Sequence, residues 1–161
     1  MKRVLLTGLF GLIAAVFCAG AIFTVHAHVT RPAPWDPAPF LEIAQQYDVE
    51  IRRDNWGVPH IYGPRDADVA YGLGYAHAED DFATIQEVAI ATRGKLGAVK
   101  GPDAAVTDYI VHLLQVWETV EAQYETALSE ETRAVLEAYA HGINLFAALH
   151  PDEVEPGLAP M

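Results

Sequence analysis

Serine and cysteine, the side chains most often used as nucleophiles, each occur once in this 161-residue chain, as Ser129 and Cys18. Ser129 lies in Leu128-Ser129-Glu130-Glu131-Thr132, which offers two carboxylates and no neighbouring base. A serine hydroxyl needs a base to become an effective nucleophile, whereas serine ahead of acidic residues is typical of a helix N-cap. We therefore interpret Ser129 as a cap and assign no catalytic residue in this chain. Cys18 alone excludes an intrachain disulfide and a cysteine-rich zinc site.

The spacing of the other polar residues indicates neither a metal site nor a cofactor site. Glu79-Asp80-Asp81 is interpreted as a solvated helix junction rather than a calcium site, because successive helical residues diverge by roughly 100°. Neither HxxxH nor HExxH spacing occurs among the histidines that follow the first thirty residues, which are His60, His77, His112, His141 and His150. Gly72 and Gly74 would need a third glycine at His77 to form a dinucleotide loop, so they predict close helix packing instead.

Composition excludes two broad classes of protein. Hydrophobic residues make up 52% and charged residues 20% of the chain, which argues against a disordered protein. Twenty-two acidic residues against ten basic ones give a net charge of -12, which repels phosphate backbones. We therefore expect no nucleic acid among the partners. The length is sufficient for one domain of ordinary size.

The first residues resemble an export signal. Lys2 and Arg3 precede an uncharged run over residues 4–25, and small residues follow near Ala27. This arrangement predicts a signal peptide over residues 1–27. The uncharged run is also long enough for an uncleaved membrane anchor, and the sequence leaves both interpretations open. Either one predicts that the rest of the chain is periplasmic or secreted.

The remainder divides into a linker, a hairpin and several helices. Residues 28–47, rich in proline, predict an extended linker. Alternating residues in 47–53 and 58–62 predict two strands, joined by a turn in which Gly57 takes a positive φ. Helical periodicity covers 66–92 in one or two helices, with Asp66 or Asp68 as the cap. It then covers residues 104–128 and the segment from Ser129 to His150. These elements give a thin core, and their apolar faces indicate docking onto something absent from the chain.

Four blocks, in order along the chain, resemble the penicillin acylase family. Residues 49–62 resemble its opening, where a strand, an Arg-Asp pair and a Gly-apolar-Pro-His-Ile turn recur. Residues 71–80 are similar to its Gly-tyrosine-alanine helix, which ends in an acidic residue. Residues 91–94 resemble the arginine-glycine pair that closes the following helix, and residues 136–144 resemble a later helix. The match covers roughly a hundred residues.

The resemblance implies an α+β protein, namely the mostly helical N-terminal portion of an N-terminal-nucleophile hydrolase with αββα layers and a short β-hairpin. Residues 48–161 would be a truncated region of the α subunit. The nucleophile would be the N-terminal serine of a β subunit, which would lie in the missing rest of the precursor. No cofactor is implied, although a structural calcium is an expectation for that missing part. The fragment would be inactive alone, and the complete precursor would hydrolyse an N-acyl amide.

The substrate class stays open between a β-lactam side chain, an acyl-homoserine lactone and a lipopeptide. Residues 79–84 depart from the Gln-Asp-Arg-Leu-Phe-Gln pattern of penicillin G acylases. They are more similar to the acyl-homoserine-lactone and aculeacin acylases, which favours long N-acyl chains. The alternative from another class is a small exported or membrane-anchored binding protein without catalytic activity.

Overall fold

The computed structural model describes residues 35–155, so the predicted signal peptide or anchor lies outside the described residues. The elements are α2 (Ala38–Ala44), β1 (Glu50–Arg53), β2 (Pro59–Tyr62), α3 (Asp66–Thr92), α4 (Leu96–Lys100), α5 (Ala105–Leu113), α6 (Val116–Ala127) and α7 (Glu130–Leu149). Short 3-10 turns cover Pro102–Ala104 and Pro151–Glu153. This part of the chain is mostly helical with one two-stranded sheet, which confirms the predicted class. None of its helices is long and apolar enough to cross a membrane.

Helix α2 lies inside segment 28–47, for which the sequence predicted a linker. Pro37 is its N-cap and Pro39 lies in its first turn, where a missing N–H costs no helical hydrogen bond. Phe40 and Ala44 pack against the buried residues of α3 and α7, which holds the helix in place. Two turns are too short to show an apolar period, so this helix has no signal in the sequence.

The hairpin forms where the alternation predicted it. The strands β1 and β2 are antiparallel, with Ile51 opposite Ile61 and Arg53 opposite Pro59. Pro59 is the first residue of β2, a position that suits a residue unable to donate to the ladder. Gly57 has the predicted positive φ, at 84°. The hairpin packs on α3, where a Cβ on Gly72 would lie 2.7 Å from Cγ2 of Ile61.

Helix α3 has the predicted bounds, but its N-cap residue differs from the prediction. The N-cap is Arg65, and neither Asp66 nor Asp68 occupies that position. Asp68 instead accepts a hydrogen bond from the Arg65 backbone N–H at 3.1 Å, which satisfies one of the donors that a helix start leaves free. Asp81 has non-helical angles, φ -155° and ψ 58°, and kinks the helix at the predicted junction.

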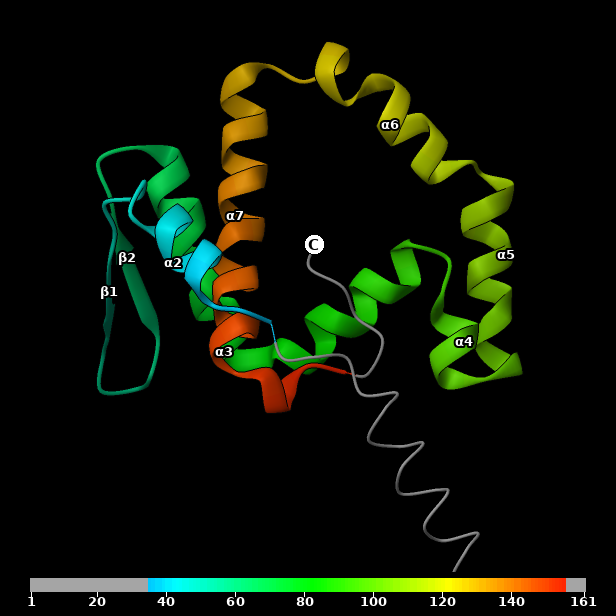
Figure 1. Ribbon diagram of the computed structural model, residues 1–161, viewed down its shortest axis with the longest axis horizontal. Helices are drawn as coiled ribbons and strands as arrows, with labels where there is room; N and C mark the ends of the chain where they lie inside the picture. Colours follow the sequence, from blue (N-terminus) through cyan, green and yellow to red (C-terminus); the bar gives the residue numbers. More distant parts are fainter. Residues whose placement is uncertain (1–34, 156–161) are drawn as a thin grey trace, which may run out of the picture. The chain divides into compact units, whose positions relative to one another are not determined.

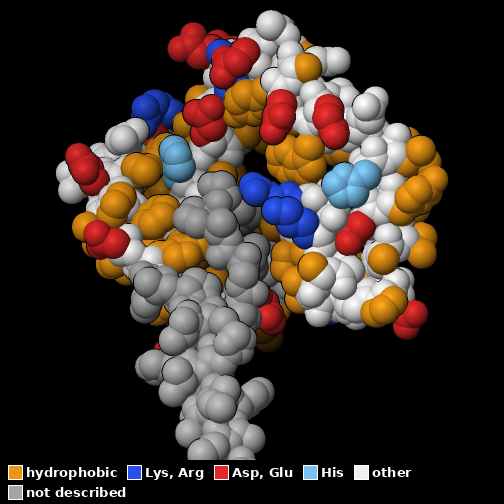
Figure 2. All heavy atoms as spheres, turned by 45° about the vertical axis from the view of Figure 1, so that its right-hand side comes forward, with side chains coloured by type: hydrophobic (Ala, Val, Ile, Leu, Met, Phe, Trp, Pro, Cys, Tyr) orange, Lys and Arg blue, Asp and Glu red, His pale blue; other side chains and the backbone are white. Residues whose placement is uncertain are grey.

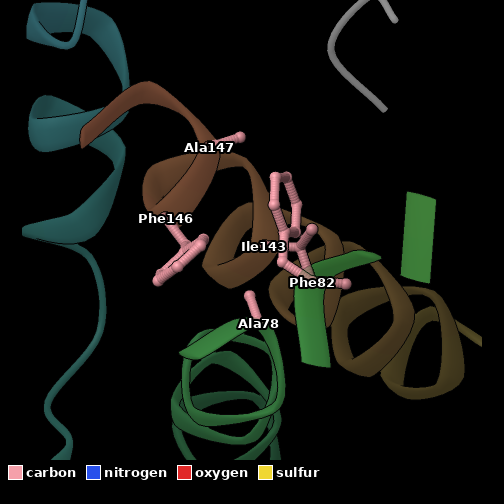
Figure 3. Close-up of a cluster of buried hydrophobic side chains, with 5 residues drawn as sticks. All are labelled: Ala78, Phe82, Ile143, Phe146 and Ala147. Atoms are coloured by element: carbon pink, nitrogen blue, oxygen red, sulfur yellow. The ribbon is translucent and has the colours of Figure 1, made fainter. Parts of the chain in front are cut away.

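The core lies between α3 and α7, which run side by side in Figure 1. Figure 3 shows apolar side chains of the two helices gathered at this contact, namely Ala78, Phe82, Ile143, Phe146 and Ala147. Elsewhere in the contact the two backbones come very close. A Cβ on Gly74 would lie 2.2 Å from the carbonyl oxygen of Tyr139, and one on Gly142 equally close to that of Tyr71. The close helix packing predicted for Gly72 and Gly74 is therefore confirmed for Gly74 and wrong for Gly72, which lies against the hairpin.

Between α3 and α7 the sequence predicted one helix over residues 104–128, and this was wrong. The structure has two helices, α5 and α6, which are separated at Gln115. Gln115 takes a left-handed backbone conformation with φ 51°, although no glycine or proline marks the break. No residue of α4, α5 or α6 is buried among the described part of the chain. The region α4–α6 is thus attached to α3 and α7 without a core of its own.

We expect Gln115→Gly to raise the free energy of unfolding by about 0.5–1 kcal/mol, because glycine takes positive φ without a Cβ clash. The matched control is Gln123→Gly inside α6, where glycine lowers helix stability by about 1 kcal/mol. Urea unfolding measures both effects. Equal destabilisation by the two substitutions would contradict the break at Gln115.

Candidate functional site

Ser129, the only serine, is the N-cap of α7, as predicted. Its side-chain oxygen accepts a hydrogen bond from the backbone N–H of Thr132 at 3.1 Å and lies 3.0 Å from the hydroxyl of that residue. Glu130 and Glu131 follow in the first turn, where negative charge favours the helix dipole. This position orders the start of a helix and gives Ser129 no base that could activate it.

We expect Ser129→Ala to lower the free energy of unfolding by about 1 kcal/mol, because one N–H of the first turn loses its partner. Ser129→Asp should retain most of the stability, since aspartate is also a good cap. Thermal unfolding followed by circular dichroism compares the three proteins. If alanine and aspartate were equally destabilising, the capping role would be wrong.

The acidic run Glu79-Asp80-Asp81 is occupied by protein contacts rather than arranged for a cation. Arg53 makes ion pairs of 2.9 Å with both Glu79 and Asp80. Asp81 accepts a hydrogen bond from the N–H of Thr84 at 3.3 Å. Within residues 35–155 no group of three or more His, Cys, Asp or Glu side chains could hold a metal ion. The run fastens the β-hairpin to the kink in α3.

The histidines lie apart from one another, each with its own neighbour. His60 lies 3.3 Å from the Asp54 carboxylate, and the His150 ring stacks on Phe146 at 4.2 Å between centroids. His112 lies against Gly94, whose φ is 63° and whose Cβ position would be 2.8 Å from Nε2 of His112. These contacts shape the backbone and do not converge on a site.

Two tyrosine–histidine hydrogen bonds link segments far apart in the sequence. The hydroxyl of Tyr47 lies 2.7 Å from Nδ1 of His141, and that of Tyr139 lies 2.6 Å from Nδ1 of His77. Burial raises the pKa of both tyrosines, so both stay phenols at neutral pH. Sequence spacing gave no signal for these pairs, because 94 and 62 residues separate their members.

Tyr71 lies beside one of these pairs, with its ring stacked 4.3 Å from that of Tyr47. Its hydroxyl is buried and has no hydrogen-bond partner among the described residues. Burial raises the pKa of Tyr71 to about 12, so it remains protonated and is no base at neutral pH. Through Tyr47, this stack connects Tyr71 of α3 with His141 of α7.

Among residues 35–155, the one fully buried carboxylate belongs to Asp68. It accepts hydrogen bonds from Nε of Arg65 at 2.9 Å and from the backbone N–H of Asp48 at 3.2 Å. Hydrogen bonding to Arg65 holds the pKa of the Asp68 carboxyl below its ordinary value. The ionised group thus ties the start of α3 to the segment before the hairpin. Like the other polar clusters described above, it positions backbone and contains no activated nucleophile.

Comparison with known proteins gives a consistent set of relatives. The family model for penicillin amidase matches residues 48–161. The chain is 33% identical over 111 residues to penicillin acylase 2 proenzyme of Pseudomonas sp. (strain SE83). It is 28% identical over 153 residues to the acyl-homoserine lactone acylase QuiP of Pseudomonas fluorescens. These alignments cover 68% and 93% of this chain but only 14% and 18% of the two relatives.

A solved structure agrees with these matches. The thermostable penicillin G acylase from Alcaligenes faecalis superposes with a TM-score of 0.59 at 27% identity. The superposition covers 66% of this chain and 56% of that chain. The described residues therefore share their fold with a penicillin G acylase chain.

Proposed function

This chain belongs to the penicillin amidase family, and we propose that it is the N-terminal part of the α subunit of an exported acylase precursor. The observation that carries this proposal is the family match over residues 48–161. Since the chain spans less than a fifth of its curated relatives, the activity proposed here is that of the complete protein.

The different lengths of the relatives support a precursor that is cut. The penicillin G acylase of Escherichia coli is matched over 66% of this chain and 12% of its own length. A similar share of this chain covers 56% of the solved penicillin G acylase chain. That solved chain is therefore several times shorter than the Escherichia coli protein. One relative is also named a proenzyme. We infer that this chain is also made as part of a precursor that is cut, and that a second subunit is its partner.

The proposed reaction is hydrolysis of an N-acyl amide by the N-terminal serine of the β subunit. A free α-amino group has a pKa near 8, so it can accept the proton of the serine hydroxyl through a water molecule. This chemistry needs no organic cofactor, and a structural calcium would belong to the part of the precursor outside this chain. Residues 35–155 would then hold the α subunit together rather than act on the substrate.

The proposed substrates are long-chain N-acyl amides, as in the acyl-homoserine lactone acylases. Residues 79–84 carry this preference, because they depart from the penicillin G acylase pattern. The contacts of these residues argue against a direct role in binding the acyl chain, because Glu79 and Asp80 form ion pairs with Arg53. The acyl chain would therefore be selected by residues outside the described part.

An experiment on the complete gene tests activity and substrate class together. The exported protein is purified and assayed with acyl-homoserine lactones of increasing chain length and with a phenylacetyl amide. We expect hydrolysis to be faster with the long acyl chains. A preference for the phenylacetyl amide would overturn the substrate class, and a processed protein that hydrolyses neither would overturn the acylase proposal.

Export is tested on the same preparation. We propose that the mature N-terminus lies near His28, after a signal peptide at residues 1–27. Edman sequencing of the periplasmic or secreted protein should therefore begin there. Cytoplasmic protein that retains Met1 would contradict export, and a membrane-bound protein that retains residues 4–25 would favour the anchor.

A further inference from the structure

Helix α5 presents its apolar side outward, which is the reverse of an ordinary surface helix. Its apolar residues recur at the i, i+3, i+4, i+7 spacing that normally faces a core. They are Val106, Tyr109, Ile110 and Leu113, which we call the α5 seam, and their exposed fractions are 65%, 65%, 48% and 62%. Figure 2, which brings the right-hand side of Figure 1 forward, shows hydrophobic side chains gathered along this side of the molecule.

The polar side of α5 is turned toward the chain's own backbone. The Asp108 carboxylate accepts hydrogen bonds from the backbone N–H groups of Leu96 and Gly97, at 2.7 and 2.8 Å. This caps the start of α4, and His112 lies against Gly94. Because Asp108 lies on the side of α5 opposite the seam, these contacts hold the seam facing outward.

The attachment of α6 to α3 is also polar. The indole N–H of Trp117 donates to the carbonyl oxygen of Thr92 at 2.8 Å, and the Arg93 guanidinium lies 5.1 Å from the centroid of the Trp117 ring. None of α4, α5 and α6 contains a buried residue. The region is therefore held in place by hydrogen bonds while its apolar groups remain exposed, which marks an interaction surface.

We propose that the α5 seam is the docking surface for an apolar segment of the same precursor, from the part that follows the described residues. This inference rests on the proposed function for the existence of that part. The curated relatives extend far beyond the matched stretch, which fills only 12–18% of them, so on the proposed function most of the precursor would lie outside this structure. A segment tethered in the same chain also binds at a high effective concentration.

The chemistry of the seam disfavours two other occupants. A stable dimer needs about 1,200 Å² or more of total buried area, whereas α5 has only nine residues and is about 13 Å long. Helices that lie on membranes carry Lys and Arg on their polar face, and α5 contains neither. The net charge of -12 further disfavours an anionic lipid surface.

Thiol accessibility tests the seam without relying on activity. In a Cys18→Ala background, Leu113→Cys provides a single thiol on the seam and Thr107→Cys a matched thiol beside it on α5. Both are compared in the 161-residue chain and in the complete precursor. We expect the seam thiol to react at least about tenfold more slowly in the precursor, and the Thr107→Cys thiol to change by less than about twofold.

Three results would overturn the inference. Equal labelling of Leu113→Cys in the short chain and the precursor would show that the seam stays exposed. Protection that rises with the concentration of the short chain would identify a second copy as the occupant, and protection by vesicles of neutral or anionic lipid would identify a membrane. Protection of Leu113→Cys in a processed protein that has no acylase activity would overturn the proposed function and leave the docking surface standing.

Discussion

Gly74→Ala should prevent the protein from reaching its native fold, with a loss of about 3 kcal/mol or more in the free energy of unfolding. The added Cβ would lie 2.2 Å from the carbonyl oxygen of Tyr139. That oxygen belongs to the backbone of α7, so no rotamer change can relieve the contact and the two helices would have to separate. The yield of folded protein measures the effect.

The control for Gly74→Ala is Gly101→Ala. Gly101 has φ 92° and nothing within 4 Å of its Cβ position, so alanine there meets only an unfavourable backbone conformation. We expect a cost of about 1–3 kcal/mol, because φ 92° with ψ -173° is a region that residues with a Cβ rarely adopt, and a smaller loss of yield than with Gly74→Ala. If Gly74→Ala were no more harmful than Gly101→Ala, the close approach of α3 and α7 would be wrong.

Asp68→Asn should be the most destabilising replacement of a charged residue, at about 3 kcal/mol at neutral pH. The buried carboxylate accepts hydrogen bonds from Arg65 and from the N–H of Asp48, and the asparagine amide can accept only some of them. Thermal unfolding of the mature protein at neutral pH gives the size of the loss. Asp66→Asn, an exposed change in the same helical turn, should cost less than about 1 kcal/mol.

Acid should remove the advantage of Asp68 over the asparagine variant. Hydrogen bonding to Arg65 keeps the folded-state pKa of Asp68 below its ordinary value of 3.8. Its stabilisation is therefore fully present above that ordinary pKa and is lost as the pH falls through the depressed one. The difference in melting temperature between the two proteins should narrow below about pH 4. A difference independent of pH would contradict the ionised state of Asp68.

The sequence predicted the elements whose signals are local. The bounds of α3, the capping of α7 by Ser129 and the positive φ of Gly57 follow from periodicity and turn chemistry over a few residues. The break at Gln115 has no such signal, because no glycine or proline marks the residue that takes φ 51°. Helix α2 similarly depends on packing against distant residues.

The polar contacts that organise the described residues were the hardest to predict. The hydrogen bonds of Tyr47 to His141 and of Tyr139 to His77 join segments that meet only when α3 packs on α7. The sequence indicates that Gly74 is a packing residue, but it does not indicate that the backbone of Tyr139 is its neighbour. Acidic residues 79–81 were recognised as a junction, whereas their partner Arg53 comes from the hairpin. Local patterns thus identify residues, and only the fold identifies their partners.

We propose that this chain belongs to an acylase precursor whose nucleophile lies in another part of the polypeptide. A serine-reactive inhibitor, applied to the active enzyme from the complete gene and located by peptide mass spectrometry, tests it directly. We expect one labelled residue, the N-terminal serine of the second subunit, and no label on peptides from residues 28–161. Labelling of Ser129, with loss of activity in Ser129→Ala, would contradict the claim.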